Sequence, residues 1–239
     1  PHMFRDSTGF DEFWRVVPVL EIVDSRSRCI GIIRLEDAGQ FVVDVIQGGA
    51  GTSTNMNANE VIANRALEIL GFEKGNYEVV HPLNHVNLSQ STNDVFPTAL
   101  RLTLSMKLDG LRREMENLKT SLQAKGADFA DVIKMGRTQL QDAVPMTLGQ
   151  EFDAYAVMVG EDIQRLIEAQ SLIREINMGA TAIGTGLNAH PDYARRVTEI
   201  LRNLSGVPVV GAANLVEATQ DAGAYVQLSG VLKRVAVKL

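Results

Sequence analysis

The 239-residue sequence contains a single cysteine, Cys29, and only 5% aromatic residues. One cysteine excludes an internal disulfide framework, so a reduced, cytoplasmic setting is the simplest inference. The chain also lacks any uninterrupted apolar run near the roughly 20 residues that a membrane-spanning helix requires. No run of lysine or arginine is longer than a pair, and the net charge is −6. A nucleic-acid or anionic-membrane partner needs clustered positive charge, so neither is expected.

The remaining composition is that of an ordinary globular protein. Apolar residues make up 45% of the chain and charged residues 22%. The length allows one large domain or two small ones with a substantial core. For His81, His85 and His190 we expect loop-packing or surface roles, and we expect no metal site and no cofactor.

The first 40 residues differ in pattern from the rest. Residues 16–23 and 29–33 are short β-branched apolar runs separated by turn-forming residues, which predicts two strands. Pro18 is compatible with the first strand only at a sheet edge. We therefore predict a small N-terminal segment over residues 1–40 that contains β-structure, and a helical domain over residues 41–239.

The helical domain shows several helix signals. A short helix is predicted over residues 60–70, with Gly71 as its C′ residue, and another over residues 193–204. A long helix should begin at Asn93 or Asp94, with Pro97 in its first turn. A second long helix is predicted from near Pro145 to about residue 177. A third should continue to the end of the sequence without a C-cap, which indicates a chain cut within a helix.

Apolar residues in the three long segments recur in steps of four and three. This spacing is typical of helices packed almost parallel, so the predicted fold class is mainly α, a long-helix bundle. The positions are Leu104, Leu108, Leu111, Met115, Leu118 and Leu122; Leu148, Phe152, Tyr155, Val159, Ile163 and Leu166; and Tyr225, Leu228, Leu232, Val235 and Leu239.

Four segments interrupt the helical pattern with glycine and neutral hydrogen-bonding side chains, namely residues 47–57, 85–94, 136–142 and 179–188. They can be helix caps and tight turns, because Ser, Thr, Asn, Asp and Gly favour both. Residues 48–53 lack the Lys-Ser/Thr of a P-loop and the third glycine of a dinucleotide fingerprint, so a nucleotide loop is a weak candidate. The alternative is a pocket of neutral donors for a small dianion.

The four segments resemble conserved blocks of the aspartase/fumarase superfamily. The matching motifs are Gln-Gly-Gly-Ala-Gly-Thr-Ser-Thr-Asn-Met-Asn at residues 47–57, Ser-Gln-Ser-Thr-Asn-Asp at 89–94, Gly-Arg-Thr-Gln-Leu-Gln-Asp at 136–142 and Gly-Ala-Thr-Ala at 179–182. The resemblance runs from about residue 41 to the end. It implies a long-helix bundle with a homotetrameric assembly and a site for a small dicarboxylate.

Three positions make the chain more similar to the aspartase branch than to class II fumarases. Ala50 stands where fumarases usually have serine, Thr92 where they have a second serine, and Gln139 where they have histidine. The implied reaction is reversible deamination of L-aspartate to fumarate and ammonia through a Cβ carbanion.

The resemblance also implies residue roles. Ser91 and Thr92, aided by Thr52, would bind the β-carboxylate, and Asn93 and Thr52 would contact the departing amino group. Thr138 would hold the α-carboxylate, and Gln139, which cannot titrate, would orient substrate. Ser91 and Asn93 also fit the simpler role of capping the helix ahead of Pro97.

One family motif does not occur in the sequence. The catalytic serine of the family lies in a loop that reads Gly-Ser-Ser-x-Met-Pro-x-Lys-x-Asn-Pro, and no such run is present. A general base contributes about 10²–10⁴ in rate, so we expect little or no turnover from this chain and assign it no catalytic residue. The alternatives are a class II fumarate hydratase, or a non-catalytic helical assembly fragment that kept the scaffold and lost the chemistry.

Overall fold

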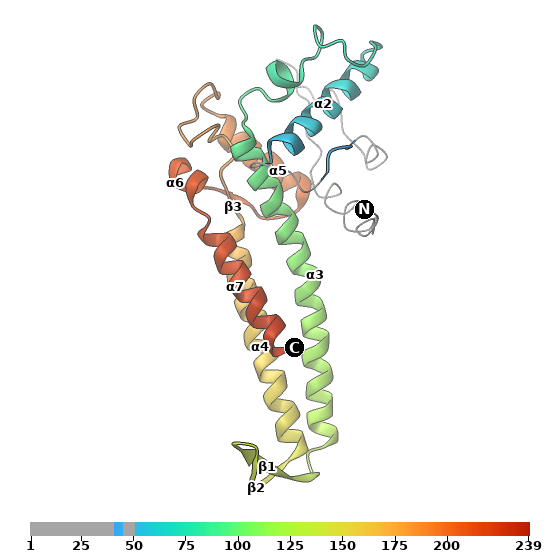
Figure 1. Ribbon diagram of the computed structural model, residues 1–239, viewed down its shortest axis with the longest axis vertical. Coiled ribbons are helices and arrows are strands. Elements are labelled where there is room, and N and C mark those ends of the chain that lie inside the picture. Colours follow the sequence, from blue (N-terminus) through green and yellow to red (C-terminus); the bar gives the residue numbers. More distant parts are fainter. Residues whose placement is uncertain (1–40, 45–50) are drawn as a thin grey trace. The chain divides into compact units, whose positions relative to one another are not determined.

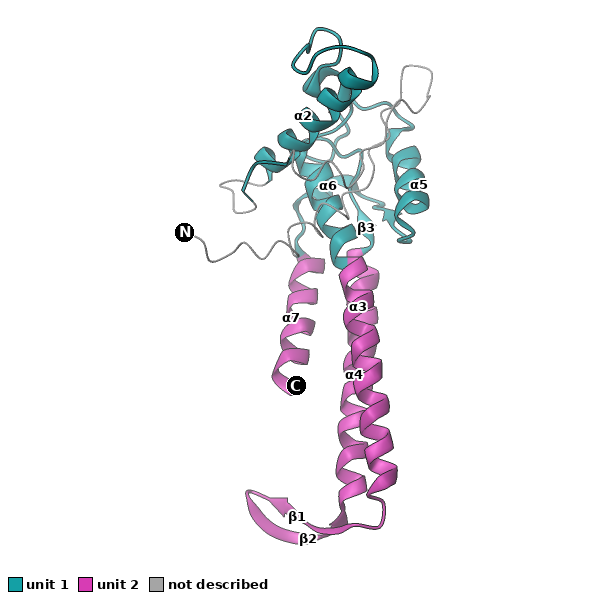
Figure 2. Ribbon diagram, turned by 90° about the vertical axis from the view of Figure 1, so that its right-hand side faces the viewer, with its two compact units in different colours: residues 1–104, 174–222 teal, residues 105–173, 223–239 magenta. Residues whose placement is uncertain are grey.

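The computed structural model describes residues 41–44 and 51–239, and most of its elements are helices, as predicted (Figure 1). The strands expected in residues 16–23 and 29–33, and the boundary expected at residue 40, lie outside the described residues. The chain divides into two compact units (Figure 2). The first contains residues 1–104 and 174–222, and the second contains residues 105–173 and 223–239.

The first unit begins with helix α2, Thr52–Ile69, which follows Gly51 directly. The predicted start at residue 60 was wrong, because residues 52–57 are helical despite their weak helix propensity. The predicted end is confirmed. Gly71 has φ +81°, and the N–H groups of Gly71 and Phe72 donate to the carbonyls of Glu68 and Leu67, which is a Schellman motif.

A π-helical turn, η2, spans Pro82–Val86, and the long helix α3 spans Thr92–Asp128. The sequence predicted Pro97 in the first turn of this helix. Because α3 starts at Thr92, Pro97 lies in the second turn, so that prediction was wrong. Proline has no N–H, so the carbonyl of Asn93 loses its regular i+4 donor. The side chain of Asn177 replaces that donor, with Nδ2 3.0 Å from the Asn93 oxygen.

The rest of the first unit packs short elements around that helix start. Strands β3, Glu175–Ile176, and β4, Val210–Gly211, pair in parallel. Helix α5, Tyr193–Ser205, ends at Gly206 with φ +70°, within one residue of the prediction. Helix α6, Leu215–Gln220, was not predicted, and its cap is Asn214, whose Oδ1 accepts from the N–H groups of Val216 and Glu217.

The second unit contains the remainder of α3 with helices α4, Leu148–Ile173, and α7, Gly223–Lys238 (Figure 2). Ion pairs from Asp162 of α4 to Arg234 and Lys238 join α4 to α7. The predicted second helix was too long at both ends. Val159, Ile163 and Leu166 are buried, as the apolar spacing predicts, whereas Leu118 is exposed. Polar pairs also join the helices: Gln170 Nε2 of α4 donates to the Ser105 carbonyl of α3 at 2.8 Å.

A β-hairpin connects α3 to α4, where the sequence indicated an irregular segment. Strands β1, Ile133–Thr138, and β2, Gln141–Thr147, pair antiparallel. The two-residue turn, Gln139 and Leu140, has φ values of +49° and +64°. Two successive positive φ values are typical of a type I′ turn, which matches the twist of the flanking strands.

Candidate functional site

Ser91 and Asp94 cap the N-terminus of α3 reciprocally. Ser91 Oγ accepts from the backbone N–H of Asn93 at 3.2 Å, and Asp94 Oδ1 accepts from the backbone N–H of Ser91 at 2.9 Å. This arrangement is a capping box with an aspartate in its last position. The capping role expected for Ser91 is therefore present, and it fixes the backbone that carries the next two candidate residues.

The N-terminus of α2 is held against the same helix end. Gly51 has φ +89°, and a Cβ built there would lie 2.4 Å from the ring of Phe96, so only glycine allows this close approach. One turn into α2, Asn55 Nδ2 donates to Thr92 Oγ1 at 3.0 Å. These two contacts bring Thr52, at the first position of α2, into the same region as Ser91, Thr92 and Asn93.

Buried asparagines join the first two polar segments. The Oδ1 of Asn87 accepts from Asn59 Nδ2 at 3.1 Å and from Asn55 Nδ2 at 3.4 Å, and the Nδ2 of Asn87 donates to the Gln90 carbonyl at 3.3 Å. Asn59 is 1% exposed. Buried amides need such partners, so these asparagines serve the scaffold.

The fourth polar segment, residues 179–188, packs against the start of α3. Asn93 Nδ2 donates to the carbonyl of Ala182 at 2.7 Å. Asp94 Oδ2 accepts from the N–H groups of Gly179 at 3.2 Å and Thr181 at 2.9 Å. Asp94 was not among the residues predicted for the site. The Ser-x-x-Asp spacing from residue 91 to residue 94 was the sequence signal that could have identified it.

The environment of Asp94 is unusual for a carboxylate. Its side chain is 0% exposed, and burial raises its pKa above the ordinary value, against the opposing effect of the N–H donors from Ser91, Thr181 and Gly179. Tyr193 lies close enough that the charge of Asp94 adds to the rise in the pKa of Tyr193, which burial causes in the first place. A buried carboxyl group held by backbone N–H groups thus lies next to the candidate residues in the sequence, at the start of α3.

The hydrogen bonds within the site determine what each candidate side chain can offer a ligand. Ser91 Oγ and Thr92 Oγ1 already accept from protein N–H groups, so each hydroxyl proton can be donated to a carboxylate. The amide of Asn93 is oriented by its bond to Ala182, and its Oδ1 is an acceptor that suits an ammonium group. The arrangement can bind a molecule that carries both a carboxylate and an amino group.

Thr138 and Gln139 belong to the second unit, at the tip of the β1–β2 hairpin. Both side chains are exposed. Gln139 adopts its positive φ without being glycine or asparagine, which costs conformational energy. Backbone strain of this kind clusters at functional positions.

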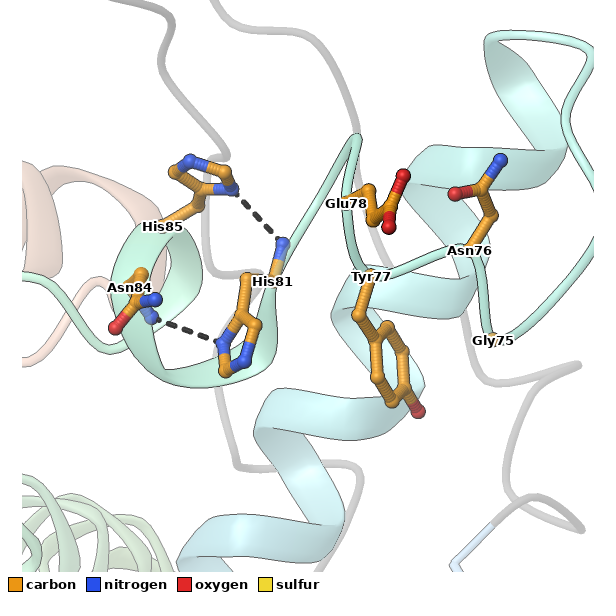
Figure 3. A pocket seen from close by; sticks show the side chains of 7 residues that line it. All are labelled: Gly75, Asn76, Tyr77, Glu78, His81, Asn84 and His85. Atoms are coloured by element: carbon orange, nitrogen blue, oxygen red, sulfur yellow. Dashed lines mark hydrogen bonds between the residues drawn. The ribbon is translucent and has the colours of Figure 1, made fainter.

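The three histidines of the helical domain have local roles. Figure 3 shows the pocket lined by His81 and His85 beside Tyr77 and Glu78. His81 Nδ1 accepts from the N–H groups of Leu83 and Asn84, and His85 Nδ1 accepts from the N–H of His81 at 2.8 Å (Figure 3). His190 Nδ1 likewise accepts a nearby backbone N–H. These contacts are the loop-packing roles that we expected.

Among residues 41–44 and 51–239, no cluster of three or more His, Cys, Asp or Glu side chains is arranged to hold a metal ion. In the same part of the chain, no helix combines the length and the apolarity needed to cross a bilayer.

Comparison with known proteins gives consistent results. A family model described as lyase matches residues 27–239. An aspartate ammonia-lyase from Helicobacter pylori is 59% identical over 200 residues, which are 84% of this chain and 43% of that protein. The chain therefore spans less than half the length of this curated relative.

Solved structures show the same likeness. A crystal structure of a fumarate lyase:delta crystallin from Brucella melitensis bound to cobalt superposes with a TM-score of 0.82 at 54% identity, over 85% of this chain and 46% of that one. A class II fumarase from Schistosoma mansoni superposes with a TM-score of 0.84 at 29% identity, over 96% of this chain and 55% of that one.

Proposed function

This chain belongs to the lyase family, and from that premise we propose that it is part of an aspartate ammonia-lyase that binds a four-carbon dicarboxylate at the N-terminus of α3. The proposal favours L-aspartate over L-malate because the H. pylori aspartate ammonia-lyase is 59% identical to this chain, whereas the S. mansoni fumarase is 29% identical. The substrate and the reaction are proposals, since the chain covers 43% of that relative.

The observation that carries the proposal is the hydrogen bonding of two adjacent hydroxyl groups. Ser91 Oγ and Thr92 Oγ1 each accept one hydrogen bond from the protein, so the hydroxyl proton of each can be donated to a carboxylate. A carboxylate is the acceptor that matches two adjacent hydroxyl donors at a helix N-terminus. No fixed positive charge is required, because the helix dipole and the neutral donors together stabilise the anion.

The reaction would proceed by elimination. A base removes the Cβ proton of L-aspartate, and the electron pair spreads into the β-carboxylate as an enediolate. The C–N bond then breaks, its electron pair leaves with the amino group as ammonia, and the Cα–Cβ double bond of fumarate forms. Donors placed where charge develops are worth about 10²–10³ in rate each, which is the role proposed for Ser91 and Thr92, with help from Thr52.

The amino group and the second carboxylate would use other residues. Asn93 Oδ1 and Thr52 would contact the amino group. For Thr138 and Gln139, the family resemblance alone supports a contact with the α-carboxylate and an orienting role. The loop motif that carries the family's base is not among the 239 residues. We therefore propose that this chain binds substrate but turns it over slowly or not at all.

We also propose that the chain assembles with copies of itself, in a cytoplasmic homotetramer of the family type. Several large apolar side chains in the second unit are exposed, including Val157 at 63%, Val226 at 70% and Leu140 at 92%. A contiguous apolar patch of several hundred Å² marks an interface, and we propose that these side chains contribute to one. A monomer in sedimentation velocity at high concentration would contradict the assembly.

The test is direct binding and turnover with the purified chain. We expect saturable binding of succinate, an unreactive dicarboxylate, by calorimetry, and at most slow fumarate formation from L-aspartate and none from L-malate. Thr92→Val removes the hydroxyl without changing the shape and should weaken succinate binding about tenfold. Its matched control is Thr103→Val, because Thr103 Oγ1 donates only to the Ala99 carbonyl within α3.

Two results would contradict the proposal. One is equal succinate affinity in the Thr92→Val and Thr103→Val variants. The other is fumarate formation from L-malate but not from L-aspartate, which would reassign the chain to the fumarases.

A further inference from the structure

The carboxylate of Asp94 connects two segments that are distant in the sequence. Oδ1 accepts from Ser91 N–H at 2.9 Å, within the second polar segment. Oδ2 accepts from Gly179 N–H at 3.2 Å and from Thr181 N–H at 2.9 Å, within the fourth. Each oxygen is therefore committed to a different segment.

The partners of Asp94 are backbone groups and not cations. Within the described part of the chain, no lysine or arginine forms an ion pair with it, although its side chain is 0% exposed. Placing an uncompensated carboxylate in the interior is costly. An aspartate kept there despite this cost has a role that a neutral side chain of the same size does not fill.

Thr181 shows what the carboxylate holds in place. Its φ is +58°, which is a genuine outlier for a β-branched residue. Two contacts retain this conformation: the N–H bond to Asp94 Oδ2, and the Oγ1 bond to the carbonyl of Ala180 at 2.6 Å. The strained turn places the carbonyl of Ala182 at 2.7 Å from Asn93 Nδ2 and so orients the Asn93 amide.

We propose that Asp94 is a positioning residue of the dicarboxylate site, and that it locks the Ser91 cap to the strained Thr181 turn so that Ser91, Thr92 and Asn93 present their polar groups together. The role in ligand binding rests on the proposed function; the locking of the two segments does not. Asp94 itself touches no substrate in this account. It acts through Ser91 on one side and through Thr181 and Asn93 on the other.

The chemistry of the carboxylate makes Asp94→Asn a sharp test. An asparagine amide has one oxygen and one NH2 group, whereas both oxygens of Asp94 accept N–H bonds. In either orientation, the NH2 group of the variant opposes at least one N–H donor. The orientation that preserves the two bonds on Oδ2 releases the backbone of Ser91, and the other orientation releases Gly179 and Thr181. The variant therefore loses the hydrogen bonds to one of the two segments, although the volume of its side chain is almost the same as that of aspartate.

The experiment compares Asp94→Asn with Asp162→Asn, which alters a second buried carboxylate that lies in the other unit and binds Arg234 and Lys238. Backbone amide hydrogen exchange is measured without ligand, and succinate affinity is measured on the same samples. For Asp94→Asn we expect at least tenfold faster exchange in residues 89–95 or 177–184 and about tenfold weaker succinate binding. Asp162→Asn should leave both unchanged within twofold.

A second variant separates positioning from general destabilisation. Thr181→Gly relieves the positive φ and keeps the N–H that Asp94 accepts, and its own succinate affinity is the reference for the double variant. The double variant Asp94→Asn/Thr181→Gly should recover part of the lost affinity, because the turn then needs less support. A purely structural role for Asp94 would give no such recovery.

The outcomes separate the two proposals. If Asp94→Asn retains natural exchange rates, or if Asp162→Asn weakens succinate binding equally, the positioning role is overturned. If the natural chain binds no dicarboxylate, the proposed function fails, and the exchange data alone decide whether Asp94 locks the two segments.

Discussion

Each unit of the molecule contains a buried aspartate, and the two carboxylates are held in different ways. Asp94 in the first unit is 0% exposed and accepts only backbone N–H groups, whereas Asp162 in the second is 2% exposed and accepts from Arg234 Nε at 2.6 Å and Lys238 Nζ at 3.1 Å. Asp162 joins α4 to α7 by charge. Asp94 instead binds backbone N–H groups around the start of α3, so it fixes the position of the backbone there. A lysine or arginine side chain as the partner would leave the backbone free to move.

The difference teaches how the two units use buried polarity. In the second unit, the charges of Asp162 are neutralised by side chains that remain partly in water, so the pair stabilises helix packing. In the first unit, no comparable neutralisation is present among the described residues, and the raised pKa of Asp94 reflects that. The Asp94 carboxyl group therefore fixes the backbone at the start of α3, whereas the Asp162 carboxylate holds α4 and α7 together.

We expect the largest loss of stability from Asp94→Ala. A small loss would contradict the difference between Asp94 and Asp162 described above. Three buried N–H groups would lose their acceptor, at about 1–3 kcal/mol each, so we expect the free energy of unfolding to fall by about 3 kcal/mol or more. Asp162→Ala leaves Arg234 and Lys238 able to reach water and should cost less, about 1–2 kcal/mol. Urea unfolding of both variants measures this, and equal losses would remove the distinction between the carboxylates.

Gly51→Ala should have the next largest effect. The new Cβ would meet the Phe96 ring at 2.4 Å, at a φ of +89°. Steric displacement of the ring together with a left-handed conformation should cost about 2–3 kcal/mol. Succinate affinity should also fall, because Thr52 would move away from α3. Thermal unfolding and calorimetry on one preparation test both effects, and a stable variant with natural affinity would contradict the contact.

The pH dependence of stability should have opposite signs for the two aspartates. Burial raises the pKa of Asp94, so its contribution to the unfolding free energy is greatest at low pH and declines as pH rises from the ordinary aspartate pKa, about 3.9, through the raised value. Burial also acts to raise the pKa of Asp162, but hydrogen bonds from Arg234 and Lys238 bring it below the ordinary value. Its contribution is complete above about pH 3.9 and declines as pH falls through the lowered pKa.

Unfolding free energies measured against pH would show these signs as differences between the natural chain and each Asp→Asn variant. The advantage of the natural chain over Asp94→Asn should shrink as pH rises, while its advantage over Asp162→Asn should grow. Parallel curves would show that the two carboxylates titrate alike.

We expect the smallest effect from a substitution in α7 of the second unit, which should change stability without changing ligand binding. Gly230 lies within α7, and a Cβ built there meets no atom within 4 Å. Gly230→Ala should therefore stabilise the chain by about 0.5–1 kcal/mol through helix propensity. An increase in Tm of a few degrees is expected, with succinate affinity unchanged, and a decrease in Tm would show that this face of α7 is covered.

The sequence predicted the parts of the fold that depend on local patterns. The apolar spacing located the long helices, and Gly71 and Gly206 marked two helix ends. The end of α4 could not be read locally, because Glu175 leaves the helix to pair with Val210, a residue far along the chain. The hairpin turn at Gln139 and Leu140 has neither glycine nor asparagine, so the usual signal of a type I′ turn was missing.

At the site, the sequence suggested the residues that we propose to contact a ligand, but it did not reveal the residues that support them. Thr52, Ser91, Thr92 and Asn93 were found through family motifs, and the structure places all four at the adjoining starts of α2 and α3. Asp94, Asn177 and Thr181 were missed as partners, because their roles depend on contacts between segments more than 80 positions apart. No local pattern encodes such contacts.

Pro97 also has a consequence for the order in which the chain acquires its structure. The carbonyl of Asn93 receives its hydrogen bond from a side chain 84 positions further along. While the polypeptide emerges from the ribosome, that turn of α3 stays incomplete until residue 177 has been synthesised. The Asn93 carbonyl at the start of α3 therefore acquires its side-chain donor only after the whole of α3 has been synthesised.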